Sequence, residues 1–353
     1  MTRLVTGHQL NFQKESGLSM ANGQTETQRQ SFLSKLKMIY YRQFVIRFKI
    51  LKGTIRSKSL YAKTLKAGRC YYGPFTGEFG HLLGHNLPFI AYLYSKGVQV
   101  EFCGMEIHRP FFVDEKGQEI VSSYLPLRDF FKEAAPDCNS ATEPEDVHKV
   151  SNRFVEKAKT SGLPYWDLSD RFHYFESFRW WIARQEYEKA FDLSKTYKTR
   201  DEDSVVIFPR KRNTNFSQEA ELRNNGEAWD YYEVAKIASR YFEKVYVVGH
   251  PAFSVGFESF NNVEVSIAND NAYILEKCSN SRLIICQHSG SVYLGEYTNT
   301  QVLIIYKGGR KIGDIEITRQ FKNALGRKFE FDYAYSLEEI DSYLSKKYET
   351  VRN

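Results

Sequence analysis

Glu78 is the carboxylate in this sequence whose surroundings best suit proton transfer. It lies between two glycines in GEFGHLL (77–83), directly after RCYYGPF (69–75), where a predicted strand gives way to a predicted helix. Such a junction exposes backbone amides and leaves room for a ligand, and a carboxylate there can act as a general base towards a hydroxyl nucleophile. The alternative is structural, because a negative charge at a helix start also complements the helix macrodipole.

Arg210, Lys211 and Arg212 form a second candidate site in FPRKRN (208–213). The run directly follows a predicted buried strand, DSVVIFPR (203–210). Guanidinium groups bind phosphate oxygens in forked pairs, so this run could neutralise a diphosphate. Most charge runs are solvated turns, but the position of this one, after the first strand of a second folding unit, favours a ligand.

Ser289, Gly290 and Ser291 form a third candidate site, in QHSGS (287–291) between a predicted strand and a predicted helix. Their hydroxyl and backbone N–H groups would lie at a helix N-terminus, which carries partial positive charge and suits a diphosphate. Taken alone, the segment is explained more simply if Ser289 only caps the helix.

No metal site is predicted. His81 and His85 lie one turn apart on a predicted helix, but the sequence offers no third ligand, so they are interpreted as polar lining or core. The acidic run at 201–203 precedes its strand instead of following it. No CxxC pair occurs among the five cysteines, which are Cys70, Cys103, Cys138, Cys278 and Cys286.

Short β-rich runs alternate with helices in two parts of the chain, which predicts parallel sheets covered on both faces. The predicted strands are 69–75, 98–104, 119–127, 203–210, 244–250, 261–268, 282–288 and 300–308. The predicted helices are 79–97, 225–242, 271–281, a short one within 289–299, 336–349, and most of 128–195. Ser336 and Glu339 form a capping-box pattern before the last helix.

The fold class is therefore α/β, with two α/β units that are joined near 196–202 and have a cleft between them. Ligands in such sheets bind beyond the carboxyl ends of the strands, where all three candidate segments lie. The predicted organisation is a flexible segment (1–30), a first domain with a basic helical leader (31–198), a second domain (199–335), and a C-terminal helix and tail (336–353).

Residues 31–67 mix lysine and arginine with apolar residues and contain no acidic residue. A basic amphipathic segment of this kind can lie on an anionic membrane surface. The alternative, equally weighted, is a helix that packs on the domain and leaves a solvated basic side. RNA binding is a less favoured use.

Bulk composition points to a cytoplasmic protein with anionic partners. The net charge is +6, but 49 basic and 43 acidic residues are nearly balanced, so no nucleic-acid partner is expected. Cys103 and Cys286 lie in apolar runs and are interpreted as buried thiols of a reducing compartment. The N-terminus lacks the apolar core of a signal peptide, and no apolar run is long enough to span a bilayer.

Taken together, these segments resemble, over roughly residues 69–310, glycosyltransferases of the GT-B fold, and the resemblance implies two Rossmann-like domains that face a central cleft. The segment QHSGSVYLGEYTNTQVLIIYKGG is similar to the "SG…H-L-A…P…I-x-I-Y-G" stretch of heptosyltransferase-like members, with Tyr293 in place of the usual histidine and Thr300-Gln301 in place of a Gly/Thr-Pro pair. GPFTGEFGHLL resembles their N-terminal glycine-rich turn, and AWDYYEVAKIA (228–238) resembles the aromatic helix after their basic loop. Fucosyltransferases and polysaccharide pyruvyltransferases share this architecture.

The resemblance implies a metal-independent transfer of a hexosyl, pentosyl or deoxyhexosyl group from a nucleotide-diphosphate sugar to a glycan acceptor, as in polysaccharide biosynthesis. It places the acceptor on residues 31–198 and the donor on 199–335, with Glu78 as the base and no further cofactor. The implied donor-binding residues are Arg210, Lys211 and Arg212 with Ser289, Gly290 and Ser291 at the diphosphate, Gly249 and His250 at the base of the nucleotide, and Glu296 at the ribose or sugar.

Two other functions stay open from the sequence. A pyruvyltransferase of the same architecture would need a site for a single phosphate and no nucleobase pocket. A non-enzymatic RNA- or membrane-binding protein would depend on residues 31–67 alone.

Overall fold

The computed structural model describes ten stretches of the chain: 47–75, 80, 82–126, 153–168, 191–210, 229–251, 254–268, 270–287, 289–306 and 331–348. The chain divides into two compact units, residues 1–52 and 53–353. Both β-sheets belong to the second unit.

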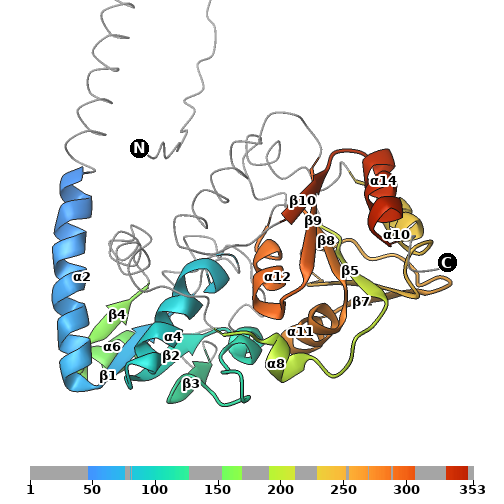
Figure 1. Ribbon diagram of the computed structural model, residues 1–353. Helices are drawn as coiled ribbons and strands as arrows, with labels where there is room; N and C mark the ends of the chain where they lie inside the picture. The colour runs from blue at the N-terminus through green and yellow to red at the C-terminus, as the bar shows by residue number, and fades with distance from the viewer. Residues whose placement is uncertain are drawn as a thin grey trace, which may run out of the picture. The chain divides into compact units, whose positions relative to one another are not determined.

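The first sheet is parallel, with four strands in the order β3-β2-β1-β4 (Figure 1). Its helices include α4 (Leu87–Ser95), between β1 and β2, and α6 (Arg153–Thr160), before β4. Alternate residues face opposite sides, so Tyr72, Phe102 and Trp166 pack with α4 in one cluster, while Tyr71 packs with α6 in another. The strands are β1 (Arg69–Gly73), β2 (Gln99–Gly104), β3 (Ser123–Pro126) and β4 (Tyr165–Asp167).

The helical expectations for this half hold in part. Of residues 128–195 the structure describes 153–168 and 191–195, which contain the helix α6 but also β4, a strand of three residues that is too short to show an alternating pattern. The helix expected over 79–97 is confirmed over 82–95, but it begins as a π-helix, η2 (Leu82–Asn86), which continues into α4. Pro88 gives the reason, since its ring clashes with the carbonyl four residues earlier and prevents a regular α-helical turn. Gly97 follows α4 with φ of +76°, as expected of a helix stop.

The second sheet is parallel, with six strands in the order β10-β9-β8-β5-β6-β7. Counted along the chain from β5, this is the 3-2-1-4-5-6 order of doubly wound nucleotide-binding folds. The predicted strands are confirmed with shorter bounds, and β10 is an addition that the sequence did not indicate. The strands are β5 (Ser204–Phe208), β6 (Lys244–Gly249), β7 (Val263–Ile267), β8 (Leu283–Cys286), β9 (Gln301–Ile305) and β10 (Phe331–Ala334).

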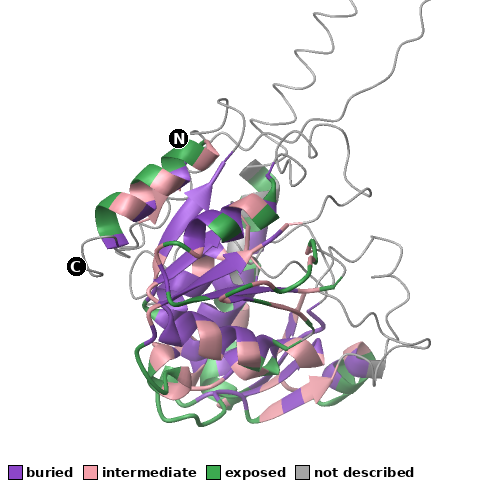
Figure 2. Cartoon of the chain, turned by 90° about the vertical axis from the view of Figure 1, so that its right-hand side faces the viewer, coloured by how far each residue is buried: buried purple, intermediate pink, exposed green. Residues whose placement is uncertain are grey.

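Helices cover both faces of this sheet, and its central strands are buried (Figure 2). Val205 and Ile207 of β5 face a cluster built with α10 (Tyr231–Ala238) and α14 (Leu337–Tyr348). Val206, between them, faces a cluster built with α11 (Asn271–Asn280) and α12 (Val292–Thr298). The two doubly wound parallel sheets confirm the predicted α/β fold class, and the central cleft stays a prediction.

The predicted cap of the last helix is also confirmed. The backbone N–H of Glu339 donates to Ser336 Oγ over 3.2 Å, and the Glu339 carboxylate accepts from the backbone N–H of Tyr335 over 2.9 Å. These bonds satisfy N–H groups that would otherwise lack partners in the first turn of α14.

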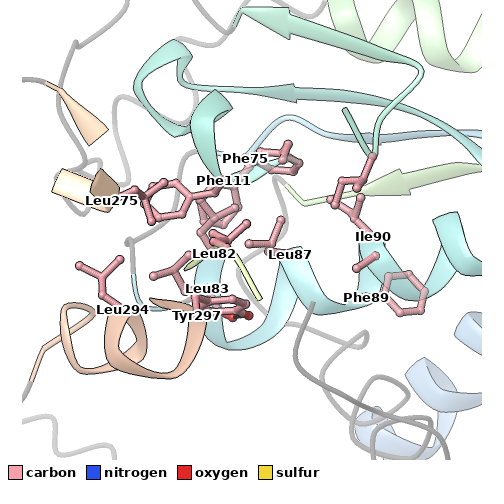
Figure 3. Close-up of a cluster of buried hydrophobic side chains, with 14 of the residues drawn as sticks. Phe75, Leu82, Leu83, Leu87, Phe89, Ile90, Phe111, Leu275, Leu294 and Tyr297 are labelled. Carbon is pink, nitrogen blue, oxygen red and sulfur yellow. Dashed lines mark hydrogen bonds between the residues drawn. The ribbon is translucent and has the colours of Figure 1, made fainter. Parts of the chain in front are cut away.

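One buried apolar cluster joins the two halves (Figure 3). Leu82 and Leu83 of η2 belong to it together with Leu275 of α11 and Tyr297 of α12. The Tyr297 hydroxyl donates to the backbone carbonyl of Leu83 over 2.6 Å, and the Asn271 side-chain amide donates to the carbonyl of Ile107 over 2.7 Å. The sheets are therefore connected by packing and hydrogen bonds as well as by the chain.

The connecting segment is also held by both halves. It contains a short helix, α8 (Ser194–Tyr197), preceded by Leu193, whose N–H donates to Tyr297 O over 2.8 Å. The Tyr197 hydroxyl donates to Pro110 O over 2.6 Å, and Asn280 Oδ1 accepts the backbone N–H groups of Thr199 and Arg200.

Helix α2 (Arg47–Ala67) confirms helical structure for the last part of the basic leader. Its Thr64 Oγ1 accepts a hydrogen bond from Trp166 Nε1 over 3.0 Å, and its Tyr61 hydroxyl lies 2.9 Å from that of Tyr92. No helix among the described stretches combines the length and the apolar character needed to cross a bilayer.

Candidate functional site

The carboxyl ends of β5 and β8 define the candidate site. These two strands are neighbours, and Phe208 of β5 pairs in register with Cys286 of β8, so both strands end at the same level. The chain leaves β5 towards β6 on one side and leaves β8 towards β9 on the other. Such a reversal of strand order opens a crevice in which doubly wound folds bind their ligands.

Arg210 lies at this edge, two residues beyond the end of β5. Its backbone forms an isolated antiparallel bridge with Ser254, and the N–H of Val255 donates to Pro209 O over 3.1 Å. The segment that follows β6 therefore holds the segment that follows β5. The Arg210 side chain is half-buried, which leaves part of it accessible to a ligand.

Tyr231 packs beside Arg210 and was not found from the sequence. It is the first residue of α10, where Asp230 caps the helix by accepting from the N–H groups of Tyr232 and Glu233. Burial raises the pKa of the Tyr231 hydroxyl, and the adjacent backbone and charge of Arg210 offset part of that rise.

Ser289, Gly290 and Ser291 begin three residues beyond the end of β8, at the same edge. The Ser291 N–H donates to Ser289 Oγ over 3.3 Å, and the Val292 N–H donates to Ser289 O over 3.2 Å. Ser291 occupies the cap position of α12 without a side-chain cap bond. The helix α12 has only seven residues, so the partial positive charge at its N-terminus is small. An anion bound at this edge would therefore depend mainly on the positive charge of Arg210.

The structure brings the first and third candidate segments together. A Cβ placed on Gly80 would lie 3.4 Å from Gly290 Cα, and a Cβ placed on Gly84 would lie 3.1 Å from the Tyr293 ring and hydroxyl. Gly80 follows Glu78 by two residues. The absence of side chains at Gly80 and Gly84 lets this segment approach the start of α12 closely, so these two glycines serve the contact.

Three further predicted residues lie nearby in the second sheet or its helices. Gly249 ends β6, and a Cβ there would collide with Ser254 Oγ, so packing by itself accounts for this glycine. The carbonyl of His250 accepts the Ser254 N–H over 2.9 Å. Glu296 is buried within α12, with 8% of its surface exposed. Their roles at a donor stay predictions.

Four predicted positions, Glu78, His81, Lys211 and Arg212, lie outside the described residues. The backbone of His85 lies in η2, and its side chain is also outside the description. Within the stretches that the structure describes, no group of three or more His, Cys, Asp or Glu side chains could hold a metal ion. The predicted burial of Cys103 and Cys286 is confirmed.

Asp167 is a second residue that the sequence did not indicate. It ends β4 and pairs in register with Gly73 at the end of β1, which is the switch point of the first sheet. The Leu168 N–H donates to Gly73 O over 3.3 Å and fixes the chain as it leaves the strand. The sequence analysis missed Asp167 because it assigned this region to helices. Without a strand here, nothing marked this carboxylate as lying at the carboxyl end of a strand.

Comparison with known proteins gives weak structural likenesses only. No family model matches the chain, and no curated protein matches it. Among solved structures, E. coli heptosyltransferase WaaC with ADP-2-deoxy-2-fluoro heptose is similar at 13% identity over 81% of this chain and 100% of that chain, with a TM-score of 0.42. A glycosyl transferase family 9 protein from Veillonella parvula DSM 2008 is similar at 11% identity over 79% of this chain and 88% of that chain, with a TM-score of 0.41.

A third likeness is to the iron-containing dodecameric glycosyltransferase TibC from enterotoxigenic E. coli H10407. It has 15% identity over 67% of this chain and 57% of that chain, with a TM-score of 0.35. These scores are too low to carry an argument about this chain, so its function is argued from its own residues.

Proposed function

We propose that this protein is a glycosyltransferase that moves a sugar from a nucleotide-diphosphate donor to a hydroxyl of a glycan acceptor. The observation that carries the proposal is the edge where β5 and β8 end together. Arg210 lies just beyond the end of β5, and residues 289–291 lie just beyond the end of β8. Gly80 of the first half packs closely against the backbone of Gly290. A cation and backbone amides at a switch point suit a diphosphate, and the neighbouring half can present an acceptor.

The proposed chemistry needs a base and a stabilised leaving group. The acceptor oxygen attacks the anomeric carbon, the bond from that carbon to the diphosphate oxygen breaks, and the diphosphate leaves with the electron pair. Arg210, with Lys211 and Arg212, neutralises the developing negative charge, and the amides after β8 add to it. Glu78 accepts the proton of the acceptor hydroxyl. Because arginines supply the positive charge, the proposed reaction requires no metal.

The transferred group is proposed to be a hexosyl, pentosyl or deoxyhexosyl unit. Gly249 and His250 are proposed to lie along the nucleobase, and Glu296 beside the ribose or sugar. A peripheral contact of residues 31–67 with a membrane is a separate proposal, developed in the next subsection.

A thermal-shift panel with UDP, GDP, CMP and ADP, each with and without EDTA, tests the proposal. A ligand that binds the native state raises the melting temperature by mass action. We expect one nucleoside diphosphate to stabilise the protein selectively and EDTA to leave that effect unchanged. Stabilisation by phosphoenolpyruvate and by none of the nucleotides would favour a pyruvyltransferase instead.

The variant Arg210→Ala makes the test specific to the site. Loss of a charge-assisted contact of about 1.5–3 kcal/mol predicts an affinity about 10- to 150-fold weaker by titration calorimetry. Arg240→Ala is a matched control. Arg240 follows α10, is exposed at the protein surface, and forms an ion pair in which its Nη1 lies 3.5 Å from Asp341 Oδ2. Equal nucleotide affinity in the two variants would remove Arg210 from the proposed site.

A further inference from the structure

Helix α2 exposes a stripe of large apolar side chains. Phe48, Leu51 and Ile55 have 67%, 56% and 61% of their surfaces exposed. Their spacing of three and four residues places them on one side of the helix, which turns by about 100° per residue. We call these three residues the α2 stripe.

The opposite side of the same helix is the side that packs on the protein. Gly53, Ser57 and Thr64 are buried, and the last two have 1% and 0% of their surfaces exposed. At about 100° per residue, these positions lie roughly 180° around the helix from the α2 stripe. The most deeply buried positions of α2 are thus small or polar, and Leu60 and Tyr61 pack half-buried against the core beside them. The exposed side carries large apolar side chains, which an ordinary surface helix turns towards the core.

Exposed apolar side chains are concentrated on this helix. Of the seven large apolar residues exposed in the described stretches, four belong to α2: the three of the stripe and Leu65. Single exposed apolar residues are normal, but several that share one helix side indicate an interaction surface.

The charge of α2 indicates what that surface contacts. The helix contains seven lysine and arginine residues and no acidic residue, and the whole of 31–67 is free of acidic residues. Lys52, Arg56 and Lys63 are exposed, and their spacing places them along one flank of the stripe. An apolar stripe with a cationic border matches the interface of an anionic lipid bilayer, where apolar side chains enter the acyl boundary and lysines meet the headgroups.

We propose that the α2 stripe docks this protein on an anionic membrane surface, with the axis of α2 parallel to the bilayer. Lys52, Arg56 and Lys63 contact lipid phosphates, while Phe48, Leu51 and Ile55 insert at the level of the glycerol backbone. RNA is the less favoured partner, because phosphate binding uses the cations and leaves the three apolar side chains without a role. The proposal is independent of the transferase reaction.

Vesicle co-sedimentation of the full chain tests the proposal. Vesicles of phosphatidylcholine alone are compared with vesicles in which about one third of the lipid is phosphatidylglycerol. We expect binding to the anionic vesicles, and a partition coefficient at least about tenfold lower for F48S/L51S/I55S, since each buried apolar side chain contributes to insertion. K52Q/R56Q should weaken binding about fivefold for each charge removed, and added salt should weaken it in the parent protein.

Tyr232→Ser is the matched control, since Tyr232 is a large side chain with 44% of its surface exposed and belongs to α10 instead of α2. It should bind vesicles like the parent protein. The thermal stability of F48S/L51S/I55S should equal or exceed that of the parent, because side chains exposed to water do not support the fold. Vesicle binding that the stripe variant retains overturns the proposal. So does a melting temperature several degrees lower, or a dimer that dissociates on substitution, because the stripe would then be covered by protein.

Discussion

The four-stranded sheet and the six-stranded sheet wind in the same order about their first strands, β1 and β5. The switch point of the first sheet lies between Gly73 and Asp167, and that of the second lies between the strands that lead to Arg210 and Ser289. One edge thus carries a carboxylate, and the other carries a cation and backbone amides. The shared winding decides where a ligand can lie, and the residues just beyond the strands decide its charge.

The two sheets also differ in how they are covered. The six-stranded sheet has a helical layer on each face, built from α10 and α14 on one side and from α11 and α12 on the other. The cluster that contains α11 and α12 continues into the first half through Leu82 and Leu83. The layer that contains α11 and α12 thus shares one buried cluster with the first half.

The largest expected effect separates the roles of the two switch points. Glu78→Gln should lower kcat by about 10²- to 10⁴-fold, because an amide cannot accept the acceptor proton. Its nucleotide affinity, measured by calorimetry, should stay at the wild-type value, in contrast to that of Arg210→Ala. Asp167→Asn is the companion variant and should retain turnover.

The outcome distinguishes two carboxylates in the first half. Unchanged kcat in Glu78→Gln, with collapse in Asp167→Asn, would transfer the role of the base to Asp167. Weakened nucleotide binding in both variants would contradict the division into a donor side and an acceptor side.

An intermediate effect tests whether the halves form one cooperative unit. Tyr297→Phe preserves the ring but leaves the buried Leu83 carbonyl without its 2.6 Å donor, which should cost about 1–3 kcal/mol of unfolding free energy. Urea unfolding followed by fluorescence should give one transition at lower denaturant. Tyr241→Phe, which removes a half-buried bond to Asp341, is the control and should cost less. Two separate unfolding transitions in the wild-type protein would show that the two halves unfold independently and would contradict a shared core.

The smallest expected effect concerns Glu202, which lies just before β5, at the edge of the second sheet where the amino ends of its strands meet. Burial acts to raise the pKa of Glu202, but hydrogen bonds from Tyr246 and Arg200 hold it below its ordinary value of 4.5. A carboxyl group with a lowered folded-state pKa adds stability above its unfolded pKa, and this stability is lost as the pH falls through the folded pKa. The term should be below about 1 kcal/mol, because the Arg200 side chain is largely exposed.

Melting temperatures of wild type and Glu202→Gln between pH 7 and pH 3 measure this term. The wild type should be the more stable at neutral pH, and the gap should narrow below about pH 4.5. A gap that stays constant with pH would contradict the linkage. Nucleotide affinity should be equal in the two proteins. This result would show that Glu202, before β5, contributes to stability only, in contrast to the proposed ligand-binding role of Arg210 after β5.

Several elements followed from local sequence alone. The strands β5, β6, β8 and β9 are continuous apolar runs, so their burial on both faces was readable from composition. Gly97 and the Ser336–Glu339 pair marked helix ends through backbone and capping preferences that act within a few residues. The α/β class follows from the alternation of such elements, because parallel strands need crossover helices.

Elements that depend on partners distant in the chain were missed. The strand β4 has three residues and exists because it pairs with β1, and the strand β10 exists because it pairs with β9. The π-helical form of Leu82–Asn86 was also missed. Its local cause, Pro88, marks only a break in the α-helix, and the close packing on Tyr293 involves a residue about 200 positions away in the chain.

The sequence by itself determined that a basic run and a Ser-Gly-Ser run would each follow a buried strand, because residue type and hydrophobic period are local properties. Only the tertiary structure decided that β5 lies beside β8, that Gly80 touches Gly290, and that Asp167 ends a strand next to Gly73. Those facts depend on pairing and packing between segments tens to hundreds of residues apart, which no local pattern encodes.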